Sequence, residues 1–568
     1  MRISMSHRPR SPACYPARPT LLFFFGLTGI AGACAVGSAE HGVTAPPPVG
    51  VTTRAPALAA ERPGAPFSEV TASNAAALPA FAVLPAKAAG PAPREPANPS
   101  APRLTSRDYH TWIWPRPKVV QPFLGYVRVG RSVPLRSSEL VRGEGCAGGF
   151  YAVAPRGYVC RDRTVTLDPE PWFTERSAIS NAVSGPFPYR YAISDGAPMF
   201  NRIPTRAEQA RFERRYGPVG KGLKLPRSLR SHEELAIAAP IEPADPIPSF
   251  LSSTSGRPKP LALLRQSIPL GSMLSFTRAF EAEGRTWLLS ADETLVPADR
   301  TRPFKPSTFQ GVPLGGDVDL PLAWMRRTAR PHYRRASGGD GVEKTGGAWP
   351  VRSFVRLTGA SYEHAGVRYL ETTDREGPAP PRGAQSGVPR GFALYIAEPD
   401  ATVAEAETKL PFGVAAGQKW MLIRITDGTL IAYEGMTPVY ATLISPGAGG
   451  VPIKGKDPVK MSTTPLGTYY VTFKDRAATM SPEKGDDRKF WIADVPFTQY
   501  FNPPFAVHAA YWHERFGEPV SAGCVNLSPI DAEAMFQWSD PPVPEGWQGA
   551  TGAGAKENGP TTAIVVWR

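Results

Sequence analysis

Residues 506–527 read AVHAAYWHERFGEPVSAGCVNL, and this stretch decides the fold expected at the C-terminal end of the chain. Apolar and small residues surround His508 in a pattern typical of a β-strand, whose side chains alternate between the two faces of a sheet. SPID at residues 528–531 is typical of a helix start, with Ser528 as the cap, Pro at the first position and an acid at the third that reaches back to the cap. The pattern predicts a strand, a turn and a helix, with Cys524 just before the helix.

Cys524 is a candidate nucleophile. A thiol is only slightly ionised at neutral pH, so it needs a base or a cation beside it, and His508 is the available partner. Gly523 lets the backbone approach a substrate closely, and the Gly523 and Cys524 amides are placed to face a developing oxyanion. The structural alternatives are a buried small hydrophobe and a satisfied core histidine. A neutral thiol–imidazole pair, the favoured form, would gain activity near about pH 6–7, where an unshifted imidazole loses its proton.

A zinc site would use His508, His513 and Cys524 as ligands. Their spacing matches no compact zinc motif, and the stretch offers only these three candidates. We therefore expect no metal and no cofactor. His513 is expected to be structural or to face a substrate.

Alternating segments precede this stretch. QKWMLIRITDGTLIAYEGMTPVYATLISPG, at residues 418–447, contains turn signals at Gly428 and Gly435 and predicts three hairpin-linked strands. TTPLGTYYVTF, at residues 463–473, predicts one more strand after a turn. Together they indicate an antiparallel sheet that curls towards a sandwich or barrel.

These segments resemble one known family. The residues His508–Trp512 and Ser521–Leu527 are similar to the active-site signature of the bacterial L,D-transpeptidase catalytic domain, and TTPLG and LIAYEG resemble its earlier strands. The likeness covers about a quarter of the chain. One position departs from the family's common form, which has His where this chain has Ala522.

The resemblance implies a cysteine-dependent acyl transfer on peptidoglycan stem peptides. Cys524 would attack the carbonyl of the third stem residue, His508 would take the thiol proton, and D-Ala would leave. The implied catalytic residues are Cys524, His508, Ala509 through its backbone carbonyl, and Gly523. The implied substrate-binding residues are Ser521, Tyr511, Trp512 and Asn526, although aromatic packing explains Tyr511 and Trp512 equally well.

Three acyl acceptors remain open: a second stem peptide, an amine on an envelope protein, and water. The competing hypothesis is an inactive, peptidoglycan-binding envelope scaffold, and Ala522 is its support. Retention of both His508 and Cys524 favours the enzyme.

The whole chain of 568 residues is long enough for several domains, and its 65 Pro and 54 Gly favour loop-rich β structure. We expect a mainly β protein in which small barrel-like accessory modules precede a C-terminal β-sandwich or barrel catalytic domain with a helix after its cysteine. The expected divisions are an export or lipoprotein signal at 1–39, an Ala/Pro-rich linker at 40–105, β modules at 106–240 and 241–400, and the catalytic domain at 401–568.

The N-terminus indicates export. Basic residues precede an apolar run that is short for a membrane span, and Cys34 follows a weak lipobox-like sequence, so a lipid anchor through Cys34 is the alternative to a soluble periplasmic form. An oxidising compartment would let Cys146 pair with Cys160.

The formal net charge of +14 fits either an anionic envelope polymer or a solvated surface. Basic runs interleaved with aromatic residues are absent from the sequence, so we expect no nucleic-acid partner. Membrane contact is expected only through the signal or a lipid anchor.

Overall fold

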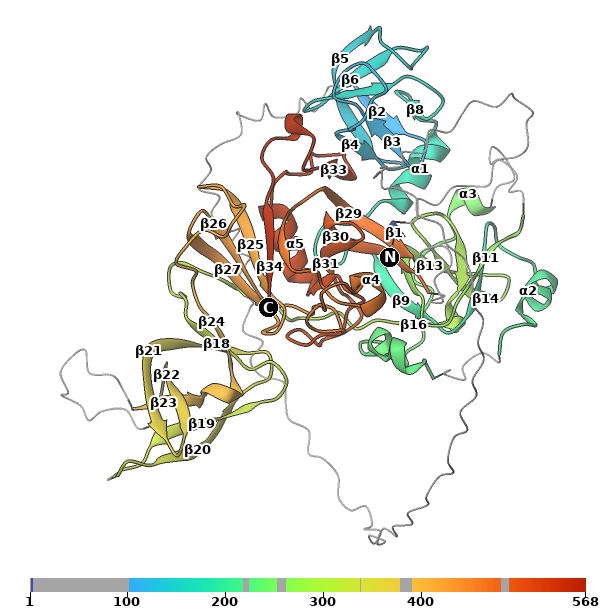
Figure 1. The fold of residues 1–568 in the computed structure, drawn as a ribbon. Helices are drawn as coiled ribbons and strands as arrows, with labels where there is room; N and C mark the ends of the chain where they lie inside the picture. Colours follow the sequence, from blue (N-terminus) through green and yellow to red (C-terminus); the bar gives the residue numbers. More distant parts are fainter. Residues whose placement is uncertain are drawn as a thin grey trace, which may run out of the picture. The chain divides into compact units, whose positions relative to one another are not determined.

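The computed structural model describes residues 2–3, 102–217, 224–252, 262–337, 339–377, 391–481 and 490–568. Within them the chain is mainly β, as predicted, and its strands form five sheets (Figure 1). The predicted signal at 1–39, apart from residues 2–3, and the predicted linker at 40–105, apart from 102–105, lie outside the described residues. No helix in the described part of the chain is long and apolar enough to span a membrane.

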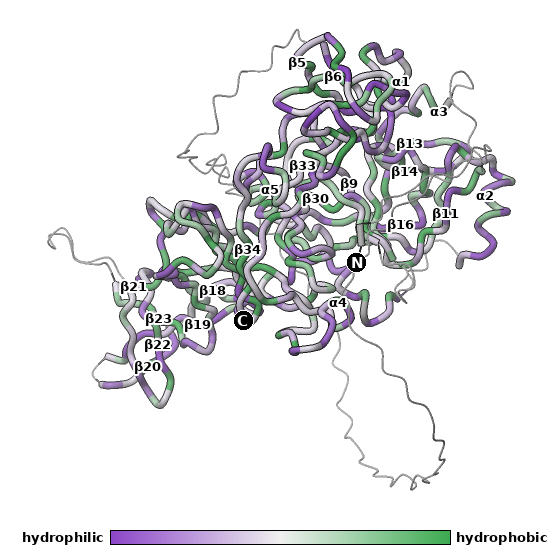
Figure 2. The backbone as a smooth tube through the Cα atoms, turned by 45° about the horizontal axis from the view of Figure 1, so that its top comes forward, coloured by the Kyte–Doolittle hydropathy of each residue, from purple (hydrophilic) through white to green (hydrophobic). Residues whose placement is uncertain are grey.

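Helices are short in the described residues. Helix α2, coloured mainly hydrophilic in Figure 2, buries none of its side chains and begins with a capping box between Thr205 and Glu208. The α-helices are α1 (Pro171–Ser180), α2 (Arg206–Glu213), α3 (Ser249–Ser252), α4 (Pro458–Met461) and α5 (Pro529–Trp538). The 3-10 helices are η1 (Arg227–Glu233), η2 (Ala298–Arg300), η3 (Glu398–Asp400) and η4 (Lys556–Asn558).

A six-stranded sheet forms one layer of the C-terminal region. Its order is β17 (Val312–Pro313), β27 (Thr437–Leu443), β26 (Thr429–Glu434), β25 (Lys419–Arg424), β34 (Ala563–Trp567) and β28 (Gly467–Tyr470). The predicted three hairpin-linked strands are confirmed as β25, β26 and β27, which pair antiparallel in sequence order. Gly428 and Gly435 in the two turns have positive φ angles, which glycine adopts without strain.

An eleven-stranded sheet combines distant parts of the chain. Its main order is β16 (Thr301–Pro303), β9 (Arg190–Ser194), β12 (Met273–Phe276), β30 (Ile492–Asn502), β29 (Phe473–Ser481), β33 (Gly549–Thr551), β4 (Gly125–Val127) and β3 (Thr111–Ile113). β31 (Phe505–Ala509) pairs with β30 and with β32 (Val525–Leu527), and β1 (Arg2–Ile3) pairs with β29. Strands from both sides of residues 240 and 400 thus belong to this sheet, and the domain divisions stay a prediction.

Three smaller sheets complete the described fold. The first contains β11 (Leu264–Ile268), β10 (Ala197–Phe200), β15 (Leu295–Pro297), β14 (Arg285–Leu289) and β13 (Arg278–Ala282). The second contains β20 (Val342–Trp349), β19 (Arg330–Arg335), β23 (Phe392–Ala397), β22 (Val367–Glu376), β21 (Phe354–His364), β18 (Leu322–Trp324) and β24 (Thr402–Ala404). The third contains β7 (Tyr158–Cys160), β6 (Phe150–Val153), β5 (Ser132–Val141), β2 (Arg103–Ser106) and β8 (Val165–Thr166), and a disulfide between Cys146 and Cys160 ties its β7 end.

Both faces of the six-stranded sheet are buried. Met421 and Ile423 on β25 pack into a core shared with α5 and with strands β30, β31 and β32. Trp420 and Leu422, which alternate with them, pack into a second core on the opposite face. Burying such side chains contributes about 2 kcal/mol each relative to exposure, so this sheet is held from both sides.

Helix α5 begins as the sequence predicts. Ser528 caps it by accepting a hydrogen bond from the Asp531 amide at 3.0 Å, Pro occupies the first position, and the Asp531 side chain contacts the Ser528 hydroxyl in return. The Asp531 carboxylate also accepts hydrogen bonds from Tyr440 Oη (2.7 Å), Thr442 Oγ1 (2.6 Å) and the Gly311 amide (2.7 Å). These bonds tie α5 to β27.

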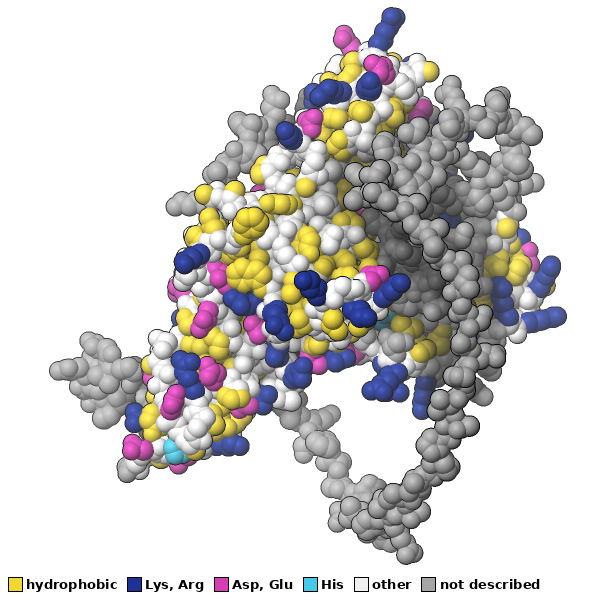
Figure 3. Space-filling model, in the orientation of Figure 1, with side chains coloured by type: hydrophobic (Ala, Val, Ile, Leu, Met, Phe, Trp, Pro, Cys, Tyr) yellow, Lys and Arg dark blue, Asp and Glu magenta, His cyan; other side chains and the backbone are white. Residues whose placement is uncertain are grey.

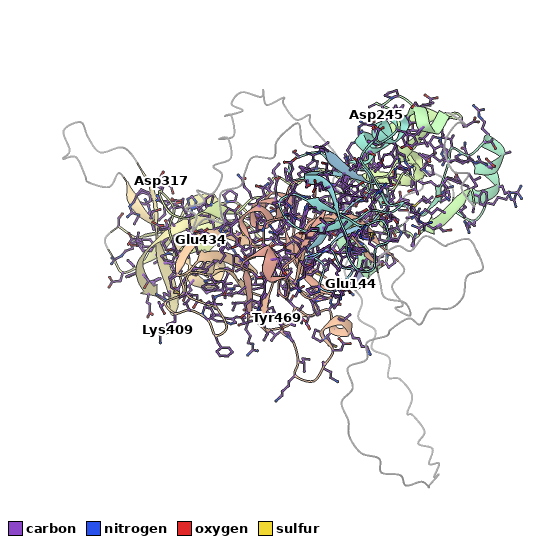
Figure 4. The ribbon with its side chains drawn as sticks, turned by 90° about the horizontal axis from the view of Figure 1, so that it is seen from above. Glu144, Asp245, Asp317, Lys409, Glu434 and Tyr469 are labelled. Atoms are coloured by element: carbon purple, nitrogen blue, oxygen red, sulfur yellow. A yellow bond between two sulfur atoms is a disulfide. The ribbon has the colours of Figure 1, made fainter. Side chains whose placement is uncertain are left out.

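The C-terminal end of α5 is held by two side chains from sheets. Trp538 Nε1 donates to the Glu434 carboxylate on β26 at 3.0 Å, and Glu434 is marked in Figure 4. Lys474 on β29 is fully buried and donates to the carbonyls of Phe536 (2.6 Å) and Ser539 (2.7 Å). Burial lowers the pKa of Lys474 well below its ordinary value.

A buried ion pair crosses the eleven-stranded sheet. Arg128, which follows β4 directly, donates to Asp494 on β30 at 2.7 Å and to Asp292 at 2.9 Å. Arg128 and Asp494 are both almost fully buried. The pair therefore joins the N-terminal part of the chain to the strand that precedes β31.

Charged side chains of both signs mix on the surface. On the face drawn in Figure 3, Lys and Arg side chains are interspersed with Asp and Glu. Exposed pairs such as Arg202–Glu208 and Arg334–Glu343 follow the same pattern. The absence of a nucleic-acid partner stays a prediction.

Candidate active site

Two adjacent strands hold His508 and Asn526 side by side. β31 and β32 pair in parallel, with His508 opposite Asn526. Because side chains alternate along a strand, Ala506 lies on the face of His508, and Cys524, directly before β32, packs against Ala506. The alternate residues Val507, Ala509, Val525 and Leu527 pack on the other face, in the core shared with α5.

His508 is a buried imidazole with both ring nitrogens hydrogen-bonded. Its Nδ1 donates to the carbonyl of Ala509 at 2.9 Å, and its Nε2 accepts from Asn526 Nδ2 at 3.1 Å. Burial lowers the pKa of His508 to about 4, against which the bond to Ala509 acts. The imidazole is therefore neutral at neutral pH, and the titration expected near pH 6–7 moves to a lower pH.

Cys524 lies in a small apolar cluster beside this face. Its side chain is 8% exposed and packs with Ala478, Tyr500 and Ala506. Its Sγ is 3.9 Å from the carbonyl oxygen of Pro504. The thiol is therefore largely buried among apolar side chains.

The turn before Cys524 is held by hydroxyl groups. Ser521 Oγ donates to the carbonyl of Cys524 at 2.5 Å and accepts from the Gly523 amide at 3.1 Å. Thr464 Oγ1 donates to the carbonyl of Gly523 at 2.9 Å. Ser521, predicted to bind substrate, therefore shapes the turn, and the Gly523 amide, predicted to face an oxyanion, donates to Ser521 here.

Glycine is required at position 523. Its φ is +120°, and a Cβ built there would come within 2.7 Å of the Phe505 ring. Ala522 beside it is exposed. A side chain at position 522 can therefore vary without disturbing the turn.

Tyr511 and Trp512, predicted to line a substrate groove, are buried. The Tyr511 ring stacks on Tyr191 at 3.8 Å between centroids, and its hydroxyl donates to the carbonyl of Ala493. The carbonyl of Trp512 accepts a hydrogen bond from the Leu235 amide. This burial favours the packing interpretation of both aromatic residues.

His513 and Asn526 form a contact that the sequence alone did not indicate. His513 Nε2 lies 3.2 Å from Asn526 Oδ1, and His513 Nδ1 accepts from the Arg515 amide at 3.2 Å. His513 is fully buried and Asn526 is 2% exposed. The only sequence signal was a second histidine five residues after His508, which predicted no partner.

A metal ion has no evident place here. Across the described ranges, no group of three or more His, Cys, Asp and Glu side chains is arranged to hold one.

The fold thus buries a histidine and a cysteine, His508 and Cys524, next to two paired strands of its C-terminal region. Residues 418–556 match the YkuD family model, which describes the L,D-transpeptidase catalytic domain. This chain thus contains an L,D-transpeptidase catalytic domain, as the resemblance predicted. No curated protein sequence matches the chain.

Solved structures similar to the chain carry the same family name. An L,D-transpeptidase from Xylanimonas cellulosilytica is 21% identical, with 28% of this chain and 65% of that one covered and a TM-score of 0.19. One from Stackebrandtia nassauensis is 22% identical, with 28% and 62% covered and a TM-score of 0.18. One from Mycobacterium smegmatis is 16% identical, with 36% and 91% covered and a TM-score of 0.20. The chain spans less than two thirds of the first two.

Proposed function

We propose that the C-terminal region is a cysteine-dependent L,D-transpeptidase that acts on peptidoglycan stem peptides. The observation that supports the proposal is the pairing of β31, which carries His508, with β32, which begins directly after Cys524, together with the packing of Cys524 against Ala506 of β31 inside the matched segment. A neutral imidazole with an unprotonated Nε2 beside a thiol is the arrangement that general-base activation needs.

The reaction has two steps. Cys524 Sγ attacks the carbonyl carbon of the third stem residue while His508 Nε2 takes the thiol proton, so that a carbon–sulfur bond forms. The bond to D-Ala then breaks, and His508 returns the proton to the departing amine. An amine acceptor attacks the thioester, gives its proton to His508 and releases Cys524 as a thiol.

The surrounding groups have defined roles in this proposal. The Ala509 carbonyl holds the Nδ1 proton of His508. Asn526 Nδ2 must release Nε2 before His508 can accept the thiol proton, and the contact between thiol and imidazole then tightens when substrate binds. The Gly523 amide must leave Ser521 before it can stabilise an oxyanion with the Cys524 amide.

The acceptor and the location are also proposals. A second stem peptide as acceptor would produce a crosslink, an amine on an envelope protein would produce an anchor, and water would produce hydrolysis. The substrate requires that the domain works outside the cytoplasm, with 1–39 as a signal or with a lipid on Cys34.

The inactive scaffold remains the second candidate, and Ala522 is the observation in its favour. Residue 522 is exposed, whereas His508 and Cys524 are buried and ordered by the strand pair. Loss of an exposed imidazole leaves the buried pair intact, which favours the enzyme.

A carbapenem challenge followed by intact mass measurement tests the proposal. We expect one covalent adduct on the full chain and none on Cys524→Ala, with a melting temperature close to that of the original protein because one sulfur atom contributes only about 1 kcal/mol. Absence of an adduct at any dose would support the scaffold. Mass analysis of products from a tetrapeptide stem would then distinguish a crosslinked dimer from a hydrolysed tripeptide.

A further inference from the structure

We propose that His513 is a positioning residue: acting through Asn526, it fixes the proton on Nδ1 of His508 and keeps Nε2 unprotonated. The catalytic meaning of this arrangement rests on the proposed function. The arrangement itself rests on a line of four hydrogen bonds from the Arg515 amide to the Ala509 carbonyl.

The two ends of this line have only one possible role each. The Arg515 amide can only donate, so His513 Nδ1 must carry a lone pair. The Ala509 carbonyl can only accept, so His508 Nδ1 must carry a proton. Neutral rings then leave a proton on His513 Nε2 and a lone pair on His508 Nε2. Asn526 fits between them with Oδ1 towards His513 and Nδ2 towards His508.

The opposite orientation of the Asn526 amide is not compatible with two neutral rings. With Nδ2 towards His513, both nitrogens of His513 would have to accept, which requires an imidazolate anion in a fully buried position. With Oδ1 towards His508, both nitrogens of His508 would have to donate, which requires an imidazolium. His513 therefore excludes the orientation that would favour a protonated, inactive base.

The backbone around the line is fixed by Ser445. Its amide and carbonyl exchange two hydrogen bonds of 2.9 Å with Asn526, and its hydroxyl donates to the carbonyl of Arg515 at 2.7 Å. The same residue thus holds both the Arg515 segment and the Asn526 backbone. The Arg515 guanidinium is engaged elsewhere, with Glu518 at 3.0 Å.

Few titratable groups surround the two rings. Arg515, His232 and His508 act on His513, each lowering its pKa, and burial is the largest cause of its fall to about 4. Cys524 packs against Ala506, two residues before His508 on β31. Loss of the His513 donor would let Asn526 turn, stabilise a doubly protonated His508 and raise its pKa towards the ordinary 6.5.

The test compares His513→Phe, which keeps a ring without a donor, with His513→Gln, which keeps a donor towards Asn526. In the full chain labelled with ¹⁵N-histidine, we expect His508 to be protonated at Nδ1 and bare at Nε2 from about pH 5 to 8 in the original protein and in His513→Gln. In His513→Phe we expect protonation of Nε2 to begin about two pH units higher. Carbapenem acylation at about pH 5 should fall about tenfold or more in His513→Phe and stay unchanged in His513→Gln.

Several results would overturn the inference. A proton on Nε2 of His508 in the original protein at neutral pH would overturn the inference. This result needs no variant, so the inference can be tested even if His513→Phe fails to fold. Equal titration of His508 in both variants would also do so. If the original protein forms no carbapenem adduct while its His508 titrates as expected, the proposed function fails and the positioning role of His513 stands.

Discussion

At the scale of single residues, the two buried imidazoles make the fold sensitive to acid. The pKa values of His508 and His513 are each lowered to about 4 by burial, against 6.5 in an unfolded chain. The unfolded state therefore binds more protons between these values. The stabilisation is fully present above about pH 6.5 and is lost as the pH falls towards 4.

We predict that the free energy of unfolding depends less on pH in His513→Gln than in the original protein. Between about pH 7.5 and pH 4, each histidine should reduce the free energy of unfolding by about 3 kcal/mol. His513→Gln should lose one such contribution, so its stability should vary with pH by about 3 kcal/mol less than that of the original protein. Urea unfolding at both pH values measures this. Burial raises the pKa of Asp475 to about 6, so Asp475 changes the free energy of unfolding with pH in the opposite direction. Its contribution is the same in both proteins and cancels when they are compared. Equal pH dependence in the two proteins would contradict the burial of a neutral His513.

At the scale of elements, the start of α5 is the clearest test. Ser528→Ala removes the hydroxyl that accepts from the Asp531 amide and leaves that donor buried. We expect a loss of about 1–2 kcal/mol in the free energy of unfolding and weaker carbapenem acylation, because α5 backs the strands that carry His508 and Cys524. Chemical denaturation and intact mass report the two effects.

Thr205→Ala is the matched control, since it removes an equivalent cap from α2. That helix buries no side chain in the described structure, so we expect a smaller loss of stability and unchanged acylation. Similar effects from both substitutions would mean that α5 does not support the site in the way its packing indicates.

The elements also separate what the sequence could reveal from what it could not. Local patterns predicted β25 to β27, their glycine turns and the Ser528 cap, because each depends on neighbours along the chain. The partners of Asp531 and His513 come from residues that only the tertiary fold brings close. Aromatic side chains beside the histidine motif have the same sequence pattern whether they line a groove or pack in a core. The sequence therefore does not predict whether Tyr511 is buried.

At the scale of the whole molecule, Arg128 links segments that are far apart in the sequence. Arg128→Met leaves the Asp494 carboxylate buried without its cation, so we expect a loss of about 3–5 kcal/mol in the free energy of unfolding. Arg334→Met breaks an exposed pair with Glu343 and should cost at most about 1 kcal/mol. Guanidinium denaturation of the two variants compares them directly. Comparable losses would show that the Arg128 pair is solvated in solution.

The pairing of Tyr126 on β4 with Gly549 on β33 has a consequence for the order in which the molecule can fold. A ribosome delivers β3 and β4 long before β33 exists, so this part of the sheet has no neighbour for most of synthesis. Contacts of such high sequence separation pay a large loop-closure entropy and slow the final step. Completion of the sheet that contains β31 must therefore wait until residues 549–551 have been synthesised.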